Sequence, residues 1–219
     1  MIISSQGGFK GMDGIAIDVL LIGFLERDEE GNVIPEGTSS TSTLIRCPGH
    51  NIVVDTGSPF MKAGIKTSLK QIGIFPEDVD ILILTHNHSD HKGNVAMFPK
   101  AKLLVHERES PVRGSEVMEG EDYSVCEGVK VIHTPGHTPG SCSVVVSSDR
   151  TYVIAGDACP LKDNFLKMVP PALNYDARLA LESLKRIADI ADVVVPGHGA
   201  PFFTRKAGGE RKPKGRKNR

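Results

Sequence analysis

The sequence predicts an α/β fold in which two β-sheets pack against each other and helices lie outside them. Short apolar segments of strand length recur along the chain and outnumber the segments with helical periodicity. The helical segments lie between groups of strands. Gly or Pro ends many of the apolar segments, as is typical where a strand gives way to a sharp turn. Together these observations indicate a layered arrangement.

The first half of the chain is expected to form four strands and two helices. Pro48 and Gly49 separate two of the strands and favour a hairpin between them. Apolar residues at helical spacing from Met61 to Ile72 predict an amphipathic helix over residues 59–72. A short second helix is expected after the fourth strand. The expected strands cover residues 15–26, 41–47, 51–55 and 80–84, and the short helix covers about residues 89–96.

The second half is expected to form six strands and one helix. Apolar residues recur at helical spacing from Ala177 to Ala188, and Asp176 directly before them suits the N-cap position. Residues 158–174, which lie between the expected strand over residues 151–156 and this helix, are expected to line a pocket. The expected strands cover residues 102–106, 121–126, 129–133, 142–147, 151–156 and 193–195.

Length and composition fit one globular domain followed by a basic tail. The chain has 219 residues, of which 39% are hydrophobic and 24% are charged. Residues 205–219 hold eight of the 26 Lys and Arg and only one Glu, so the rest of the chain is acidic overall. We expect a folded domain over residues 1–204 and a disordered tail over residues 205–219, because the tail lacks hydrophobic periodicity.

The sequence has no feature typical of a membrane-spanning or secreted protein. No apolar run is long enough to cross a bilayer, and the first residues lack the basic and apolar regions of a signal peptide. We therefore expect a cytoplasmic location and no membrane partner. The cysteines show no Cys-x-x-Cys pattern, so reduced thiols are expected at Cys47, Cys126, Cys142 and Cys159.

The most informative segment is residues 86–91, which read HNHSDH and directly follow an apolar strand. Three imidazoles and a carboxylate offer nitrogen and oxygen ligands for zinc and related metals. Alternate residues of an extended segment point the same way, so His86 and His88 can hold one metal ion. Asp90 and His91 then face a second point nearby, and the spacing suits two metal ions. A polar surface loop is the alternative. However, placing three imidazoles and a carboxylate at the end of an apolar strand costs free energy unless they have a binding partner.

Four further segments repeat the order of apolar strand, turn and metal-type residue. Each alone is a weak signal, because a Pro-Gly-His is more often a turn and an aspartate after a strand is more often a cap. All five segments in this order strongly indicate a metal site. The four segments end in Asp55-Thr56-Gly57, Pro135-Gly136-His137, Gly156-Asp157 and Pro196-Gly197-His198.

This order of residues resembles the metallo-β-lactamase superfamily of dinuclear hydrolases. The resemblance covers about residues 15–203 and is closest to the branch of metallo-β-lactamase-domain-containing protein 1, where similar runs surround residues 85–94 and 191–199. It implies a four-layer αββα sandwich with the metals at the edge where strand ends converge, which the pattern alone does not give. The residues that carry it are Asp55, His86-x-His88-x-Asp90-His91, His137, Asp157 and His198.

The resemblance also implies a role for each of these residues. Three imidazoles would hold the first metal ion, two imidazoles and a carboxylate would hold the second, and one aspartate would bridge both. Asp55 would instead orient a metal-binding histidine by accepting a hydrogen bond from its second N–H. Asp90 and Asp157 are also the candidate proton acceptors in catalysis. In order, the implied ligands are His86, His88 and His137, then Asp90, His91 and His198, and then the bridging Asp157.

The implied chemistry follows from the charge of two metal ions. Two divalent ions about 3.5–4 Å apart can share a water molecule and convert it to hydroxide near neutral pH. The hydroxide would attack an ester, lactone, thioester or phosphodiester while the metals polarise the oxygen that gains negative charge. Zinc suits this ligand set best, but iron and manganese also accept nitrogen and oxygen ligands.

The substrate class stays open at this point, as does the oligomeric state. One interpretation is a hydrolase of a small-molecule lactone, ester or thioester. The alternative is a metal-dependent RNA endonuclease or phosphodiesterase, since the basic tail over residues 205–219 suits a phosphate backbone. The tail serves equally well as a solvated segment that aids solubility. A second alternative is a mononuclear iron enzyme, because residues 136–140 resemble a motif of persulfide dioxygenases.

Overall fold

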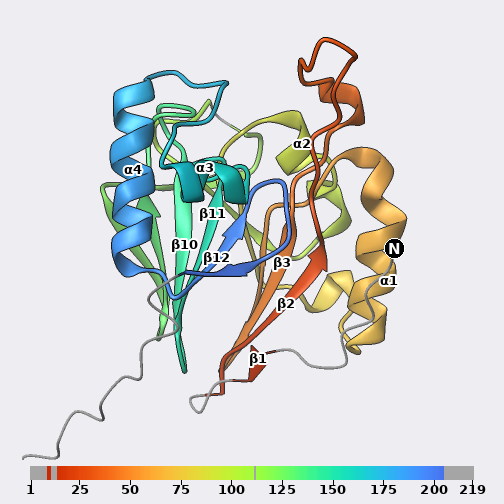
Figure 1. Ribbon diagram of the computed structural model, residues 1–219. Helices are drawn as coiled ribbons and strands as arrows, with labels where there is room; N and C mark the ends of the chain where they lie inside the picture. The colour runs from red at the N-terminus through yellow and green to blue at the C-terminus, as the bar shows by residue number, and fades with distance from the viewer. Residues whose placement is uncertain (1–8, 11–13, 111, 205–219) are drawn as a thin grey trace, which may run out of the picture.

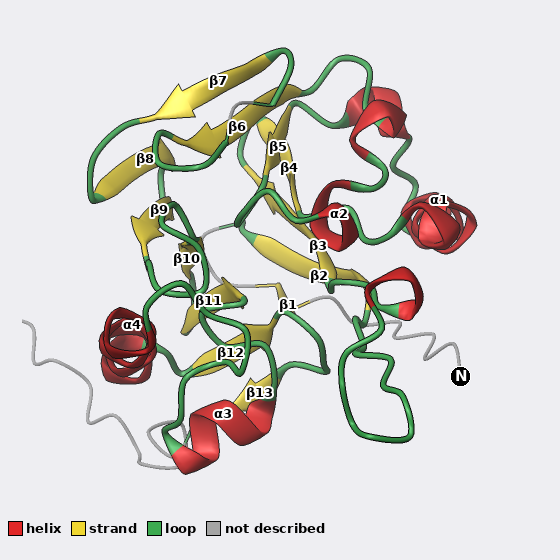
Figure 2. Ribbon diagram, turned by 90° about the horizontal axis from the view of Figure 1, so that it is seen from above, coloured by secondary structure: helices red, strands yellow, loops and turns green. Residues whose placement is uncertain are grey.

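Two β-sheets face each other in the computed structural model, and helices cover their outer faces (Figure 1). The structure describes residues 9–10, 14–110 and 112–204. The tail expected over residues 205–219 lies outside the described residues. Seen from above, helices α1 (Lys62–Gln71) and α4 (Ala177–Ile190) lie on opposite sides of the paired sheets (Figure 2).

The first sheet has seven strands and takes up the first half of the chain, with its strands in sequence order. Strands β1 to β4 pair antiparallel, whereas β4 to β7 pair parallel. The turn after Cys47 joins β3 to β4 as the expected hairpin. The strands are β1 (Phe9–Lys10), β2 (Ala16–Leu21), β3 (Ser42–Cys47), β4 (His50–Val54), β5 (Ile81–Ile83), β6 (Lys102–His106) and β7 (Ser115–Met118).

The second sheet has six strands from the second half of the chain, in the order β13-β12-β11-β10-β9-β8. All neighbours pair antiparallel except β11 and β12, which are parallel because helix α4 connects them. The strands are β8 (Asp122–Cys126), β9 (Val129–His133), β10 (Cys142–Ser147), β11 (Thr151–Gly156), β12 (Val193–Pro196) and β13 (Phe202–Phe203).

Helix α4 begins where the sequence signal predicts. Asp176 caps α4 as expected, because its Oδ1 accepts the backbone N–H of Arg178 at 2.9 Å and of Leu179 at 3.0 Å. No helix in the described part of the chain is long and apolar enough to cross a membrane. The two remaining α-helices are α2 (Ser89–Lys92) and α3 (Lys162–Lys167), and single 3-10 turns cover Pro35–Gly37, Pro59–Met61, Pro76–Asp78 and Val95–Met97.

Three apolar clusters confirm the four-layer αββα sandwich. The largest fills the space between the sheets and joins residues such as Ile45 and Val54 of the first sheet to Val144 of the second. A second cluster packs α1 on the outer face of the first sheet, and a third packs α4 on the outer face of the second sheet. Each helix contributes one apolar stripe, for example Leu184 and Ile187 of α4.

The structure differs from the sequence expectations mainly in element length. The first long strand, expected over residues 15–26, ends at Leu21. Beyond this point the backbone N–H of Gly23 donates to the side-chain hydroxyl of Thr41 at 3.0 Å instead of to a strand carbonyl. The expected helix over residues 89–96 ends at Lys92 and resumes as a short 3-10 turn. The short strands β1, β7 and β13 and helix α3 were not expected.

Candidate metal centre

The seven metal-type residues meet at one end of the two sheets, where α2 and α3 also lie (Figure 1). His86 and His88 follow β5, and α2 begins directly after them. The segments that carry His137, Asp157 and His198 follow β9, β11 and β12, respectively. Strand ends from both sheets therefore converge on one region, as the strand-then-ligand pattern predicts. The potential ligand atoms lie within 4.8 Å of one another in a first group, His86, His88 and His137, and in a second group, Asp90, His91 and His198. A further set of His86, His91 and Asp157 connects these two groups.

Three imidazoles form the first group, and their inward nitrogens almost touch. His88 Nδ1 lies 3.0 Å from His86 Nε2 and 3.0 Å from His137 Nε2. The rings pack edge to face, with centroids 4.5–4.8 Å apart. His86 and His137 are buried, whereas His88 is partly exposed. Three nitrogen lone pairs thus point at one place at the rim of the protein interior.

The second group combines two imidazoles with the carboxylate of Asp90. Asp90 Oδ2 lies 3.7 Å from His91 Nε2 and 3.6 Å from His198 Nε2. Both imidazole rings are buried. Asp90 and His91 come from helix α2, whereas His198 comes from the turn after β12, so this group joins the two sheets.

Asp157 lies between the two groups and points one carboxylate oxygen at each. Its Oδ2 lies 3.4 Å from His137 Nε2 of the first group. Its Oδ1 lies 3.5 Å from His91 Nε2 and 3.3 Å from His198 Nε2 of the second group. Gly197 lets the backbone of the last turn approach this carboxylate, because a Cβ there would collide with Asp157 Oδ1.

Hydrogen bonds from the outer ring nitrogens to backbone carbonyls orient two of the imidazoles. His137 Nδ1 lies 2.8 Å from the carbonyl oxygen of Leu173, and His198 Nδ1 lies 2.9 Å from that of Ser39. Both carbonyls can only accept, so Nδ1 carries the proton in each ring and Nε2 presents a lone pair to the centre. The same segment that was expected to line a pocket, residues 158–174, thus supplies the carbonyl that orients His137.

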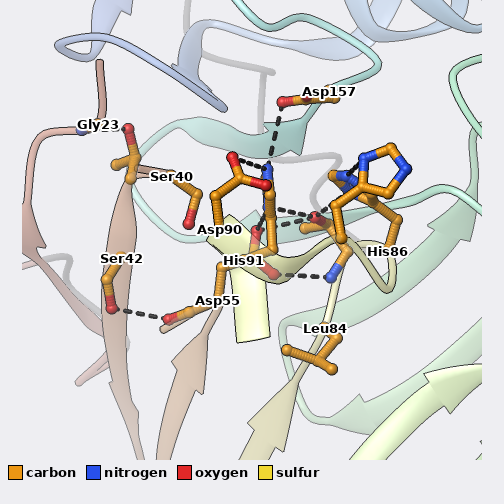
Figure 3. A network of polar contacts seen from close by, with 12 residues as sticks. Gly23, Ser40, Ser42, Asp55, Leu84, His86, Asp90, His91 and Asp157 are labelled. Carbon is orange, nitrogen blue, oxygen red and sulfur yellow. Dashed lines mark hydrogen bonds and ion pairs between the residues drawn. The ribbon is translucent and has the colours of Figure 1, made fainter. Parts of the chain in front are cut away.

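Asp55 supports both groups from below the centre (Figure 3). Its Oδ2 lies 2.8 Å from His91 Nδ1 and accepts the hydroxyl of Thr85 at 2.8 Å, while its Oδ1 accepts the Thr85 backbone N–H at 2.9 Å. Because the Thr85 hydroxyl donates to Asp55, it is free to accept from His86 Nδ1, which lies 3.2 Å away. Asp55 has a left-handed backbone (φ 55°), a conformation that a non-glycine residue adopts at a cost.

Burial favours the neutral form of His86 and His88 in the first group. It lowers the pKa of His86 well below its ordinary value, and the neighbouring His91 lowers it further. Burial also lowers the pKa of His88, and the neighbouring His137 adds to the effect. Neutral imidazoles keep the lone pairs that metal binding requires.

Carboxylates have the opposite effect on the second group. Burial alone would lower the pKa of His91, but Asp55 and Asp157 outweigh it and raise that pKa well above the ordinary value. Asp157 likewise outweighs burial at His198 and raises its pKa. In return, burial would raise the pKa of Asp157, but His198 and His91 hold it well below its usual range. The aspartates therefore favour positive charge beside the Nε2 atoms of His91 and His198, and a metal cation can supply that charge in place of the protons.

Two buried atoms in this centre lack the partner that buried polar atoms normally have. They are His91 Nε2 and Asp157 Oδ1, which face each other at 3.5 Å without a hydrogen bond to any described residue. Leaving such atoms unpaired in the interior is costly. A cation between them would satisfy both, so the residues present fit a bound metal.

Glu109 is a functional candidate that the sequence analysis missed. It lies in the loop after β6, and its Oε2 accepts the backbone N–H of Asn87 at 3.1 Å, between His86 and His88 of the first group. Its Oε1 accepts the backbone N–H of Gly140 at 3.2 Å and the hydroxyl of Thr138, on the loop that carries His137. One carboxylate therefore ties together the two loops of the first group. No local pattern marks it, because each contact spans more than twenty residues.

The segment over residues 38–43 was also missed, although it has a sequence signal. Six consecutive Ser and Thr residues read TSSTST, and all of them are buried. Ser40 donates its backbone N–H to the carbonyl oxygen of Asp90 at 3.1 Å, and Thr41 donates to Gly197 at 2.6 Å. A buried run of hydroxyl residues where an apolar strand is expected is itself a sign of a polar site.

Comparison with known proteins agrees with this geometry. The sequence profile of the metallo-beta-lactamase superfamily matches residues 35–124 and 102–198. A Methanocaldococcus jannaschii protein named "Probable metallo-hydrolase" is 39% identical over 71% of this chain and 74% of its own length. Mouse metallo-beta-lactamase domain-containing protein 1 is 33% identical over 92% of this chain and 86% of its own length. An N-acyl homoserine lactonase of a Bacillus species is 34% identical over 56% of this chain and 55% of its own length.

The fold is likewise that of solved hydrolase structures. A "probable metal-dependent hydrolase" from Staphylococcus aureus superposes with a TM-score of 0.72 at 17% identity, over 89% of this chain and 92% of the other. The superfamily profile covers most of the chain, and the potential metal ligands meet at one end of the two sheets. The chain therefore belongs to the metallo-beta-lactamase superfamily and is a metal-dependent hydrolase.

Proposed function

We propose that this protein is a dinuclear hydrolase that opens a small-molecule lactone or cleaves a related ester or thioester. The observation that carries the proposal is the position of Asp157, whose two oxygens face two separate groups of ligands. We assign His86, His88 and His137 to a first metal ion. We assign Asp90, His91 and His198 to a second ion, with Asp157 as the bridge. These residues belong to a domain that we place over residues 1–204.

The spacing of the ligand atoms supports this assignment. Nitrogen ligands about 2.0–2.1 Å from a tetrahedral zinc ion lie roughly 3.3 Å from one another. The contacts within the first group are 3.0 Å, and those among Asp90, His91, His198 and Asp157 are 3.3–3.7 Å. All ligands are nitrogen or oxygen, which favours zinc but also suits iron or manganese.

The chain's own residues would then divide the work of hydrolysis. Two divalent ions, when bound, supply hydroxide at neutral pH and an electrophile for the oxygen that gains charge. Asp157 fixes the distance between the two groups. Asp90 is only partly buried, and we assign to its carboxylate the role of proton acceptor for the attacking water. Asp55 keeps His91 in the tautomer that presents Nε2.

Exposed apolar side chains beside the centre support a small substrate with an apolar part. Leu173 and Tyr175 are 69% and 70% exposed, and both are tied by their backbone to His137 or its neighbour Gly136. Phe24 and Phe60 are 38% and 53% exposed, and their rings lie 6.5 Å apart. The Phe24 N–H donates to the Ser39 carbonyl, which also accepts from His198. The lactonase relative is named for N-acyl homoserine lactones, and the acyl group of such a lactone is the apolar part of the substrate.

A metal-reconstituted activity panel tests the proposal. Protein purified without chelator is expected to hold two metal ions per chain by elemental analysis. Reconstitution with zinc, iron or manganese is expected to give turnover of an N-acyl homoserine lactone and of nitrophenyl esters, and the chelator-treated protein serves as the control. No more than one bound ion after reconstitution would contradict the dinuclear centre and favour the mononuclear iron alternative.

The same panel distinguishes the proposed lactone or ester hydrolase from the phosphodiesterase alternative. The basic composition of residues 205–219 is the observation that favours it. Turnover of bis(p-nitrophenyl) phosphate well above that of every ester and lactone would replace the proposal with a phosphodiesterase. RNA cleavage that requires the metal would point the same way.

A further inference from the structure

Two cysteines from different sheets lie in contact at the end of the molecule opposite the candidate metal centre. Cys47 is the last residue of β3, and Cys126 is the last residue of β8. Their sulfur atoms are 2.8 Å apart. A disulfide requires sulfurs at about 2.05 Å, so bond formation needs a movement of less than about 1 Å.

We propose that Cys47 and Cys126 form a reversible disulfide that joins the two sheets when the protein meets a small-molecule disulfide such as oxidised glutathione. The reduced thiols expected from the sequence are then one of two states of this pair. This proposal is independent of the proposed hydrolase activity, because it concerns another region of the molecule.

The strand register places the pair far from the ligands. Cys47 pairs with His50 at one end of the β3–β4 hairpin, and Asp55 follows the other end of β4. Cys126 pairs with Val129 at the start of β9, and the His137 loop follows the end of that strand. Both cysteines therefore lie near the end of the sheets where β1 pairs with β2, the lower end in Figure 1.

The remaining two cysteines have different surroundings. Cys142 and Cys159 are fully buried, and each thiol contacts a backbone carbonyl, of Leu84 and Leu161 respectively, at 3.5 Å. Neither is in contact with a second sulfur within the described residues. They serve as internal controls, because a reagent that oxidises thiols without regard to geometry would also modify them.

Exposure sets the order of the two exchange steps. Cys126 is partly exposed, whereas Cys47 is only 8% exposed and burial raises the pKa of its thiol to about 12. The Cys126 thiolate therefore attacks the small disulfide first, which breaks that S–S bond and releases one small thiol. The Cys47 thiol then loses its proton and attacks Cys126 Sγ, which forms the protein disulfide and releases the second small thiol. Two protein thiols and one small disulfide thus become one protein disulfide and two small thiols.

The cross-link is expected to stabilise the fold. It closes a loop that contains β4, β5, β6, β7 and both α1 and α2, so it strongly restricts the unfolded chain. The unfolding equilibrium constant is expected to fall by about 30- to 1,000-fold. The folded sheets change little, because the two sulfurs already touch.

Thiol mapping of the full-length protein tests the proposal. Native protein with a fixed metal content is held in oxidised or reduced glutathione, and its free thiols are then alkylated in denaturant. Peptide mass spectrometry is expected to find Cys47 linked to Cys126 in the oxidised sample, with Cys142 and Cys159 alkylated in both. Return to reduced glutathione is expected to free the pair. A stable glutathione adduct on Cys126 with Cys47 still free, or linkage only after denaturation, would overturn the proposal.

Single variants connect the linkage to stability. In urea unfolding, the wild-type protein is expected to have a higher midpoint in oxidised than in reduced glutathione. Cys126→Ser and Cys47→Ser cannot cross-link, so each should have the same midpoint in both buffers, whatever its own stability. An equal midpoint for linked and reduced wild-type protein would overturn the stabilising role. Hydrolysis rates are not needed for any of these outcomes.

Discussion

The two halves of the candidate centre are built on different electrostatic principles. The first half, His86, His88 and His137, contains imidazoles alone, and burial lowers the pKa of His86 and His88. The second half, Asp90, His91 and His198, contains a carboxylate, and neighbouring aspartates raise the pKa of both imidazoles. Their supports differ as well. In the first half, the Leu173 carbonyl accepts from His137 and Glu109 ties the two loops together. In the second half, the Ser39 carbonyl accepts from His198 and the charged Asp55 bonds His91 directly.

This difference means that the halves can be disturbed separately. Where a metal is bound by imidazoles alone, its affinity depends on how precisely the loops hold the rings. Where a carboxylate and charged outer partners take part, affinity depends also on charge. Asp157 faces both halves directly and Asp55 supports both, so substitutions at residues that support one half should distinguish the halves.

The largest effect is expected from Asp157→Ala, which removes the group that both halves share. Hydrolysis should fall to the level of the metal-free protein, and fewer than two metal ions should remain after gel filtration, because each ion loses a ligand. Initial rates and elemental analysis measure the two effects. Circular dichroism checks that the sheets persist, since metal loss can also cost stability. Wild-type kcat with a full metal content would show that Asp157 is not the bridge.

Asp55→Asn is expected to weaken metal binding in both halves by about 10- to 100-fold. Oδ2 supports the second half through His91 and the first half through the Thr85 hydroxyl and His86. An amide nitrogen in its place donates where these groups need an acceptor. A stepwise cobalt(II) titration followed by visible absorption measures the affinity of each half.

Thr85→Val sharpens the comparison, because it keeps the shape of the side chain and removes only the hydroxyl. It should weaken the first half through His86 and leave the direct contact of Asp55 with His91 in place. The backbone N–H of Thr85 still donates to Asp55 in this variant. Equal losses in both titration steps would contradict a separate support for each half.

A smaller and one-sided effect is expected from Glu109→Gln. The substitution weakens hydrogen bonds to the loops of His88 and His137, so the first half should lose about tenfold in metal affinity. The second half should be unchanged. Glu107→Gln is the matched control, since Glu107 lies two residues away on the same loop and accepts only from the backbone of Gly120 at 3.0 Å among the described residues. A response of both variants, or of the second titration step, would show that Glu109 does not position the first half.

The sequence allowed the central strands to be predicted, and it pointed to the seven residues that the structure brings together, because each of them follows an apolar strand. Their role as metal ligands stays a prediction. Glu109 could not be predicted, since its partners Asn87 and Gly140 are brought to it only by the tertiary fold. The role of the Leu173 carbonyl as an acceptor could not be predicted either, because every residue has a backbone carbonyl. The edge strand β7 was missed because Glu116 and Val117 are both exposed, so the segment lacks the buried alternation of a core strand.

Removal of residues 205–219 is expected to leave metal binding unchanged in both halves of the centre. His198 lies seven residues before the cut, and Phe202 of β13 packs against the second sheet, so the truncation spares both. Hydrolysis of a nitrophenyl ester should therefore be unchanged, whereas any RNA binding should weaken, because the tail holds eight of the 26 basic side chains. For each phosphate that the shortened protein no longer neutralises, the slope of log K against log salt should become about 0.7 shallower for a single strand. Equal RNA binding by the truncated and full-length proteins, or none by either at low salt, would show that the tail has no nucleic-acid role and would favour the lactone or ester as the substrate class.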